Sequence, residues 1–81
     1  MKPATPIRSL DQIGPGENVV LQSLRADREL QGRLMQLGLF VGAAVDIVQS
    51  RAGGPMLLRV RNTLVAIGHE EAKAILVDIP K

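Results

Sequence analysis

The chain has 81 residues and a formal net charge of +2, and 46% of its residues are hydrophobic, with one Phe and no Cys, Trp or Tyr. This length predicts one domain, the missing cysteines exclude disulfides and thiolate metal sites, and a single histidine cannot build a multi-histidine site. Because the N-terminus has no apolar signal segment and no run approaches the ~20 apolar residues of a membrane span, we expect a cytoplasmic protein without direct membrane insertion.

The first segment predicts a tail, a tight turn and a strand. Residues 1–8 are expected to form a flexible N-terminal tail, so that the folded domain covers residues 9–81. Residues 14–17 read Gly-Pro-Gly-Glu, and proline in the second and glycine in the third position predict a type II turn in which Gly16 has a positive φ. Residues 18–24 then alternate as a strand.

A short helix with a defined end is predicted next, over residues 28–37. Asp27 is placed as its N-cap. Gly38 follows as the residue that must turn left-handed, and Leu34 and Leu39 then occupy the two positions that touch in a Schellman cap. The order of helix, cap and turn is a specific local signature.

The same helix carries an apolar stripe. Leu30, Leu34 and Leu37 fall on one face and, with Leu39, are expected to plug the core. Gly32 in the helix interior costs about 1 kcal/mol relative to Ala. It would allow a neighbouring backbone to approach closely.

The remaining chain alternates as strands joined by short turns. Strands are predicted over residues 44–49, 56–61, 64–67 and 75–79, with a loop at 51–54, a tight turn at Asn62-Thr63 and a helical turn at 68–73. About five short strands, one short α-helix and one helical turn cannot make two packed sheets. The expected fold is therefore mainly β, a small antiparallel barrel.

One spacing occurs twice in the chain. An apolar residue, a turn glycine and a strand follow at the same intervals in two segments: Ile13, Gly16, Val19 and Leu21, and then Leu39, Gly42, Val45 and Ile47. Two copies are too few for a repeat architecture. We interpret them as two strands that enter the sheet through similar turns.

Four motifs together resemble the FeoA family. They are Ser9-Leu10 followed by Pro15-Gly16-Glu17; Arg33-Leu34-x-x-Leu37-Gly38-Leu39-x-x-Gly42; Pro55 before an alternating strand; and Glu70-Glu71-Ala72 followed by Ile75-Leu76-Val77. The resemblance covers residues 9–79 and implies an SH3-like barrel. It also implies an accessory role for the ferrous-iron transporter FeoB, a membrane protein with a G-protein domain. The chain would dock on its cytoplasmic part, at the inner face of the plasma membrane, and modulate its activity or assembly.

Two positions depart from the family pattern and mark a candidate docking edge. Phe40 stands where the family often has Thr, and Val41 where it usually has Pro. Because Leu39 already fills the apolar position of the cap, Phe40 is expected to be partly exposed. With Arg33, where the family carries a basic residue, and Arg28, these are the predicted partner-binding residues. The alternatives are solvated arginines that lie along their own stems and a Phe40 that covers a barrel end.

No cofactor is required by the sequence. Imidazole and carboxylate suit first-row metals, so His69 and Glu70 are weak candidate ligands for a divalent Fe, Mn or Zn ion, completed across a homo-oligomer contact by Asp46 or Asp78. The family often has a basic residue in place of His69. Adjacent residues 69–71 cannot all face one ion, and a polar helical turn is the simpler interpretation.

Three function classes were compared with the docking hypothesis. No catalytic constellation or phosphate loop is present, so we expect no enzyme. A metal-responsive module related to the SH3-like domain of DtxR-type repressors remains an alternative, although no helix-turn-helix accompanies the barrel. In a nucleic-acid-binding barrel, Arg51, Arg59 and Arg61 would form the basic face, but single-strand binders normally add aromatic platforms that these strands lack. No nucleic acid is therefore expected as a partner.

Overall fold

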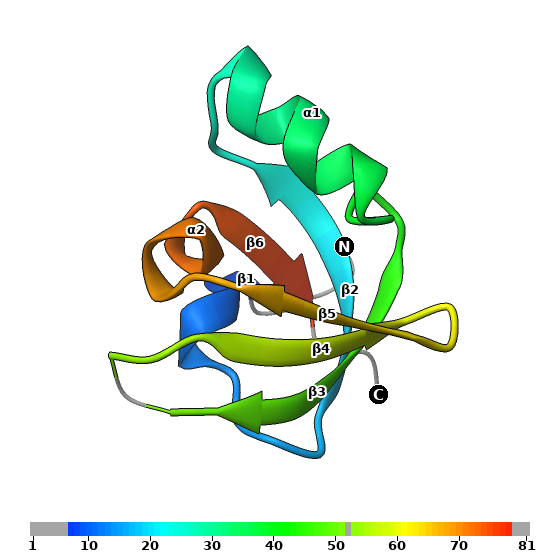
Figure 1. The fold of residues 1–81 in the computed structure, drawn as a ribbon, viewed down its shortest axis with the longest axis vertical. Helices are drawn as coiled ribbons and strands as arrows, with labels where there is room; N and C mark the ends of the chain where they lie inside the picture. Colours follow the sequence, from blue (N-terminus) through cyan, green and yellow to red (C-terminus); the bar gives the residue numbers. More distant parts are fainter. Residues whose placement is uncertain (1–6, 52, 79–81) are drawn as a thin grey trace, which may run out of the picture.

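The computed structural model describes residues 7–51 and 53–78, and they form a curled sheet with three short helices (Figure 1). In chain order the elements are β1 (Ile7–Ser9), the 3-10 helix η1 (Leu10–Gln12), β2 (Asn18–Leu24), α1 (Arg28–Gln36), β3 (Ala44–Ser50), β4 (Met56–Val60), β5 (Thr63–Ile67), α2 (His69–Lys73) and β6 (Ile75–Asp78). The expected mainly-β fold is confirmed.

The sheet has six strands in the order β1-β6-β2-β3-β4-β5, and every pair is antiparallel. The strand that the sequence analysis missed is β1, which pairs Ile7 with Asp78 and Arg8 with Val77. Those two residues had been assigned to the tail, and a three-residue strand is too short to show an alternating pattern. The rest of the predicted tail and the predicted end of the last strand, residues 1–6 and 79, lie outside the described residues.

The repeated spacing corresponds to a local two-fold arrangement of β2 and β3. Gly16 N–H donates to the Ile47 carbonyl over 2.8 Å, and Gly42 N–H donates to the Leu21 carbonyl over the same distance. Both glycines have a positive φ, +88° and +94°. Because each turn is hydrogen-bonded to the strand that follows the other turn, the two segments brace each other.

The same two-fold arrangement places a bulge in each strand. The register shifts between Leu21 and Ser23 in β2 and between Ile47 and Gln49 in β3, which are equivalent positions of the repeat. A bulge bends its strand and increases the twist. The pair of bulges explains how a single sheet curls into a barrel around one core.

The core draws side chains from every element except β1. From the helix region, Leu34 and Leu39 are buried at 1% and 0% exposure, as predicted. Leu37 was predicted to plug the core, and this was wrong: it is the C-cap residue and is 42% exposed. The helix ends at Gln36, so Leu37 leaves the helical stripe, and Leu39 is the next apolar side chain that faces inward.

Both predicted caps of α1 are confirmed, and the helix itself ends at Gln36, one residue earlier than predicted. The Asp27 carboxylate accepts a hydrogen bond from Leu30 N–H over 2.9 Å. At the other end, Leu39 N–H donates to the Leu34 carbonyl and Gly38 N–H to the Met35 carbonyl, the two hydrogen bonds of a Schellman motif.

Two local expectations need correction. A Cβ placed on Gly32 would meet nothing within 4 Å, so no neighbouring backbone approaches it. The turn between β4 and β5 consists of Arg61 and Asn62 rather than Asn62 and Thr63, because Val60 pairs with Thr63. Arg61 therefore leaves the strand face that it was expected to share with Arg59.

Candidate protein-interaction site

The four predicted partner-binding residues do not form one cluster. Arg28 is the first residue of α1, whereas Phe40 and Val41 lie on the turn that follows its last residue, Gln36. Eight residues of helical rise, about 12 Å, separate the two ends of α1. The structure therefore brings Phe40 and Val41 together and leaves Arg28 at the far end.

Arg33 is engaged within the chain. Its guanidinium lies 3.4 Å from the Glu71 carboxylate, and the other oxygen of that carboxylate accepts a hydrogen bond from Gly68 N–H over 2.8 Å. Glu71 thus caps α2 and ties it to α1 at once. The Arg33 side chain is still 68% exposed, so it can touch a partner while part of its charge is balanced by Glu71.

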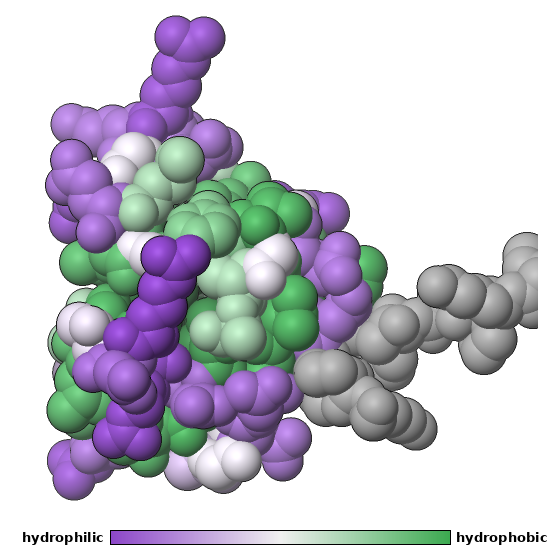
Figure 2. Space-filling model, turned by 90° about the vertical axis from the view of Figure 1, so that its right-hand side faces the viewer, coloured by the Kyte–Doolittle hydropathy of each residue, from purple (hydrophilic) through white to green (hydrophobic). Residues whose placement is uncertain are grey.

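Exposed apolar side chains gather around the end of α1. Of the six large hydrophobic residues exposed in the described part of the chain, four lie here: Met35, Leu37, Val41 and Leu64. We call these four residues the apolar edge. Figure 2, which faces the side that carries the turn after α1 and the β4–β5 hairpin, shows a hydrophobic area bordered by hydrophilic side chains. An apolar cluster with a polar border is typical of a protein-interaction surface.

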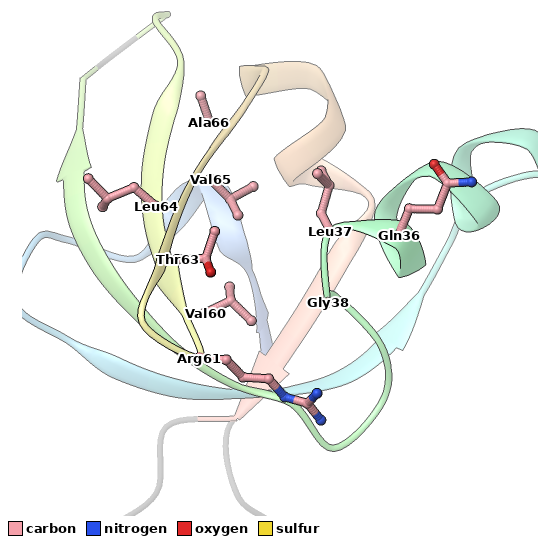
Figure 3. Close-up of a pocket in the computed structure, with 9 residues that line it drawn as sticks. All are labelled: Gln36, Leu37, Gly38, Val60, Arg61, Thr63, Leu64, Val65 and Ala66. Atoms are coloured by element: carbon pink, nitrogen blue, oxygen red, sulfur yellow. The ribbon is translucent and has the colours of Figure 1, made fainter.

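Two hollows lie on this part of the surface. The β5 groove, of about 410 Å³, runs between the end of α1 and β5, with Leu37 facing the strand (Figure 3). Its lining residues are Gln36, Leu37, Gly38, Val60, Arg61, Thr63, Leu64, Val65 and Ala66. The β2 groove, of about 430 Å³, is lined by Ser23, Leu24, Gln31, Met35, Phe40 and Val41.

One contact joins the two grooves. The guanidinium carbon of Arg61 lies 5.3 Å from the centroid of the Phe40 ring, which is within the range of a cation–π interaction. Phe40 lines the β2 groove and Arg61 the β5 groove. Phe40 is half-buried, as the sequence predicted.

Arg61, Leu37 and Leu64 are the surface residues that sequence reasoning missed. Arg61 was assigned to a strand face, although the alternating residues on both sides of Arg61-Asn62 would have allowed a two-residue turn. Leu64 was expected only as a strand residue. Its 58% exposure follows from its position on β5, which is an edge strand of the sheet.

The weak metal candidates do not converge in the described residues. His69 begins α2, and Glu70 forms an ion pair with Lys73 over 3.1 Å. Asp46 accepts a hydrogen bond from Asn18, and Asp78 one from Gln22. Within residues 7–51 and 53–78, no three His, Cys, Asp or Glu side chains are grouped so as to hold a metal ion.

No described helix is both long and apolar enough to cross a membrane.

Comparison with known proteins identifies close structural relatives. The family model for the FeoA domain matches residues 8–79. A protein described as an iron uptake regulatory protein (FeoA) is 25% identical, with a TM-score of 0.87, over 90% of this chain and 97% of its own. The FeoA protein from Chlorobium tepidum is 27% identical, with a TM-score of 0.82, over 90% of this chain and 70% of its own.

A third similar structure is a manganese-dependent transcriptional repressor. It has a TM-score of 0.87 at 20% identity, over 96% of this chain and 44% of its own. At that identity the likeness concerns the fold alone. A comparison with curated protein sequences gives no match.

Proposed function

The chain belongs to the FeoA family, and we propose that it is an accessory protein of ferrous iron uptake that docks on the cytoplasmic part of a FeoB-type transporter. Docking would modulate the activity or the assembly of the transporter and hold the chain at the inner face of the plasma membrane. The family supports the pathway, since similar proteins are described as an iron uptake regulatory protein and as an iron(II) transport protein. We further propose that the chain is not an enzyme and needs no cofactor.

The apolar edge is the observation that carries the docking proposal. A chain of this size buries only about 60% of the surface that its unfolded form exposes, so its stability margin is small and an apolar side chain left outside the core adds nothing to it. Met35 and Val41 are nevertheless 58% and 63% exposed, next to the half-buried ring of Phe40. A partner that covers them would recover the free energy of burying that area.

The two arginines have secondary roles in this proposal. Arg33 already forms an ion pair with Glu71, so a partner carboxylate competes with an existing contact. Arg28 lies at the other end of α1 and would contact only a partner that extends along the whole helix. Phe40 and Val41 are therefore expected to contribute most of the binding free energy.

A matched pair of exposed valines tests the proposal. Purified protein would be titrated against the cytoplasmic domain of FeoB, with and without guanine nucleotide. Val41→Asp places a charge in the apolar edge and should weaken binding about tenfold, whereas Val48→Asp, at a 39% exposed valine that lines neither groove, should leave it unchanged. The proposal fails if the wild-type chain binds the FeoB domain in neither nucleotide state, or if both variants lose binding equally.

The metal-responsive alternative is supported by the repressor fold alone. Titration with Fe²⁺, Mn²⁺ and Zn²⁺, followed by light scattering, tests it directly. Micromolar binding together with a change in oligomeric state would favour the alternative over docking.

A further inference from the structure

The backbone at Arg61 has a conformation that an arginine rarely adopts. Arg61 and Asn62 have φ of +51° and +65°, and they close a two-residue hairpin between β4 and β5. Such turns favour Asn-Gly, because asparagine and glycine tolerate positive φ, whereas a long side chain costs about 1–2 kcal/mol there. Residues held in strained positions cluster at binding sites, so the arginine invites a functional explanation.

The Phe40 ring gives that arginine a defined position. With its guanidinium carbon over the ring, 5.3 Å from the centroid, the side chain loses part of its freedom before any partner arrives. The ring is neither a carboxylate nor a carbonyl acceptor, so the guanidinium N–H groups keep their hydrogen-bonding capacity for a carboxylate. Phe40 is the only Phe, Tyr or Trp of the chain.

The donors of Arg61 have no carboxylate within the described residues. The two ion pairs there are Arg33–Glu71 and Lys73–Glu70. The arginine is exposed, lines the β5 groove and stacks on a ring that lines the β2 groove. A planar cation with free donors, set between two apolar hollows, is the arrangement that recognises a carboxylate flanked by apolar side chains.

We propose that Phe40 and Arg61 form a carboxylate-binding site for a partner segment that carries one acidic residue between apolar ones. The acidic side chain pairs with the Arg61 guanidinium, and the apolar neighbours enter the β2 groove against Met35 and the β5 groove against Leu37. The identity of the partner rests on the proposed docking to FeoB, whereas the chemistry of the segment rests on the site alone.

Charge favours a different protein over a second copy of this chain. Most carboxylates of the described residues are already engaged: Glu70 and Glu71 in ion pairs, Asp27 as a helix cap, and Asp46 and Asp78 with amide side chains. The chain also carries a net charge of +2, so two copies repel weakly. A nucleic acid is disfavoured, because Arg61 lies over the ring of Phe40, the only Phe, Tyr or Trp available for stacking on bases.

One substitution separates binding from folding. Arg61→Asn supplies a residue that the turn prefers, so its melting temperature should rise by a few degrees while its affinity for the FeoB cytoplasmic domain falls about tenfold. The wild-type affinity should decrease with added salt, and that dependence should be weaker for Arg61→Asn. Arg61→Lys keeps the positive charge but lacks the planar guanidinium that binds a carboxylate through two N–H groups, and it should bind with intermediate affinity.

Two further variants serve as controls. Arg59→Asn removes the same charge from an exposed residue of β4 that lines neither groove, and its affinity should equal that of the wild type. Phe40→Leu keeps an apolar side chain without the aromatic platform and should weaken binding and lower its salt dependence. If Arg61→Asn binds as Arg59→Asn does, the carboxylate site is refuted while the docking proposal stands.

A peptide titration tests the site even if FeoB does not bind. The probes are a synthetic peptide with the sequence Leu-Ala-Glu-Ala-Leu and its matched version with Gln in place of Glu. In ¹⁵N NMR spectra the Arg61 Nε–H resonance of the wild-type chain should shift with the Glu peptide and not with the Gln peptide. Equal shifts, or none with either peptide, would overturn the site.

Discussion

Gly38→Ala should destabilise the domain more than alanine at Gly16, Gly32 or Gly42. Gly38 has a φ of +89°, in a region that costs an alanine about 1–2 kcal/mol. In addition, the new Cβ would lie 3.2 Å from Cγ1 of Val60, a buried strand residue that cannot move freely. Crowding of this kind typically adds about 1 kcal/mol, so we expect a total loss of about 2–3 kcal/mol.

Three other glycines distinguish the cost of the positive φ from the cost of crowding Val60. Gly16 and Gly42 have similar positive φ, and a Cβ on either meets nothing within 4 Å, so each alanine variant should lose about 1–2 kcal/mol from backbone strain alone. Gly32 lies inside α1 with open space around it, and Gly32→Ala should gain up to about 1 kcal/mol.

Urea denaturation of the four variants measures these differences as shifts of the midpoint at constant slope. Thermal melts give a second readout, with about 4–8 °C for each kcal/mol in a domain of this size. The expected order of stability is Gly32→Ala, wild type, Gly16→Ala together with Gly42→Ala, and Gly38→Ala. A Gly38→Ala variant as stable as Gly42→Ala would show that Val60 yields at no cost, and a destabilised Gly32→Ala would refute the open surroundings of that residue.

Two further predictions concern side chains of the helix region. Leu34→Ala should lower the free energy of unfolding by about 2–5 kcal/mol, because Leu34 is 1% exposed. Leu37→Ala should lower it by at most about 1 kcal/mol, because Leu37 is 42% exposed. Equal losses in urea denaturation would contradict the cap geometry. A double-mutant cycle of Arg33→Ala and Glu71→Ala should give a coupling energy of about 0.2–1 kcal/mol, since the Arg33 side chain is 68% exposed. Glu71→Ala alone should lose more stability than Arg33→Ala, because Gly68 N–H also loses its acceptor. A coupling above about 2 kcal/mol would mean that the pair is far less hydrated than the structure shows.

The parts of the fold that local chemistry determines could be predicted from the sequence. Asp27, Gly38 and Leu39 act within one helix turn of the residues that they satisfy, so the cap can be recognised from spacing alone. Strands β2 to β5 follow from alternation bounded by turn residues. Strand β1 has three residues, too few to alternate, and it exists because β6 offers it a partner far along the chain.

The candidate site was harder to predict because its contacts are long-range. Arg33 and Glu71 are 38 positions apart, and the stacking of Arg61 on Phe40 joins two turns that follow different elements. The exposure of Leu37 depends on which residue ends α1, and that of Leu64 on which strand forms the edge of the sheet. Composition could show that Phe40 was unusual, but only the folded chain shows that a cation covers its ring.

The two-fold arrangement of β2 and β3 distinguishes the residues that determine the backbone fold from the side chains that are available to a partner. Gly16 and Gly42 occupy equivalent turns with equivalent hydrogen bonds, so the backbone makes no distinction between them. Their surroundings differ. Phe40 and Val41 precede Gly42 and line the β2 groove with Gln31 and Met35 of α1, and Phe40 also lies beneath Arg61, whereas Pro15 precedes Gly16. This shared backbone arrangement accounts for the structural likeness to both FeoA proteins and a repressor. Under the proposed docking, partner choice resides in side chains that the backbone does not determine. Phe40 is central among them, because it lines the β2 groove with Val41 and lies beneath Arg61.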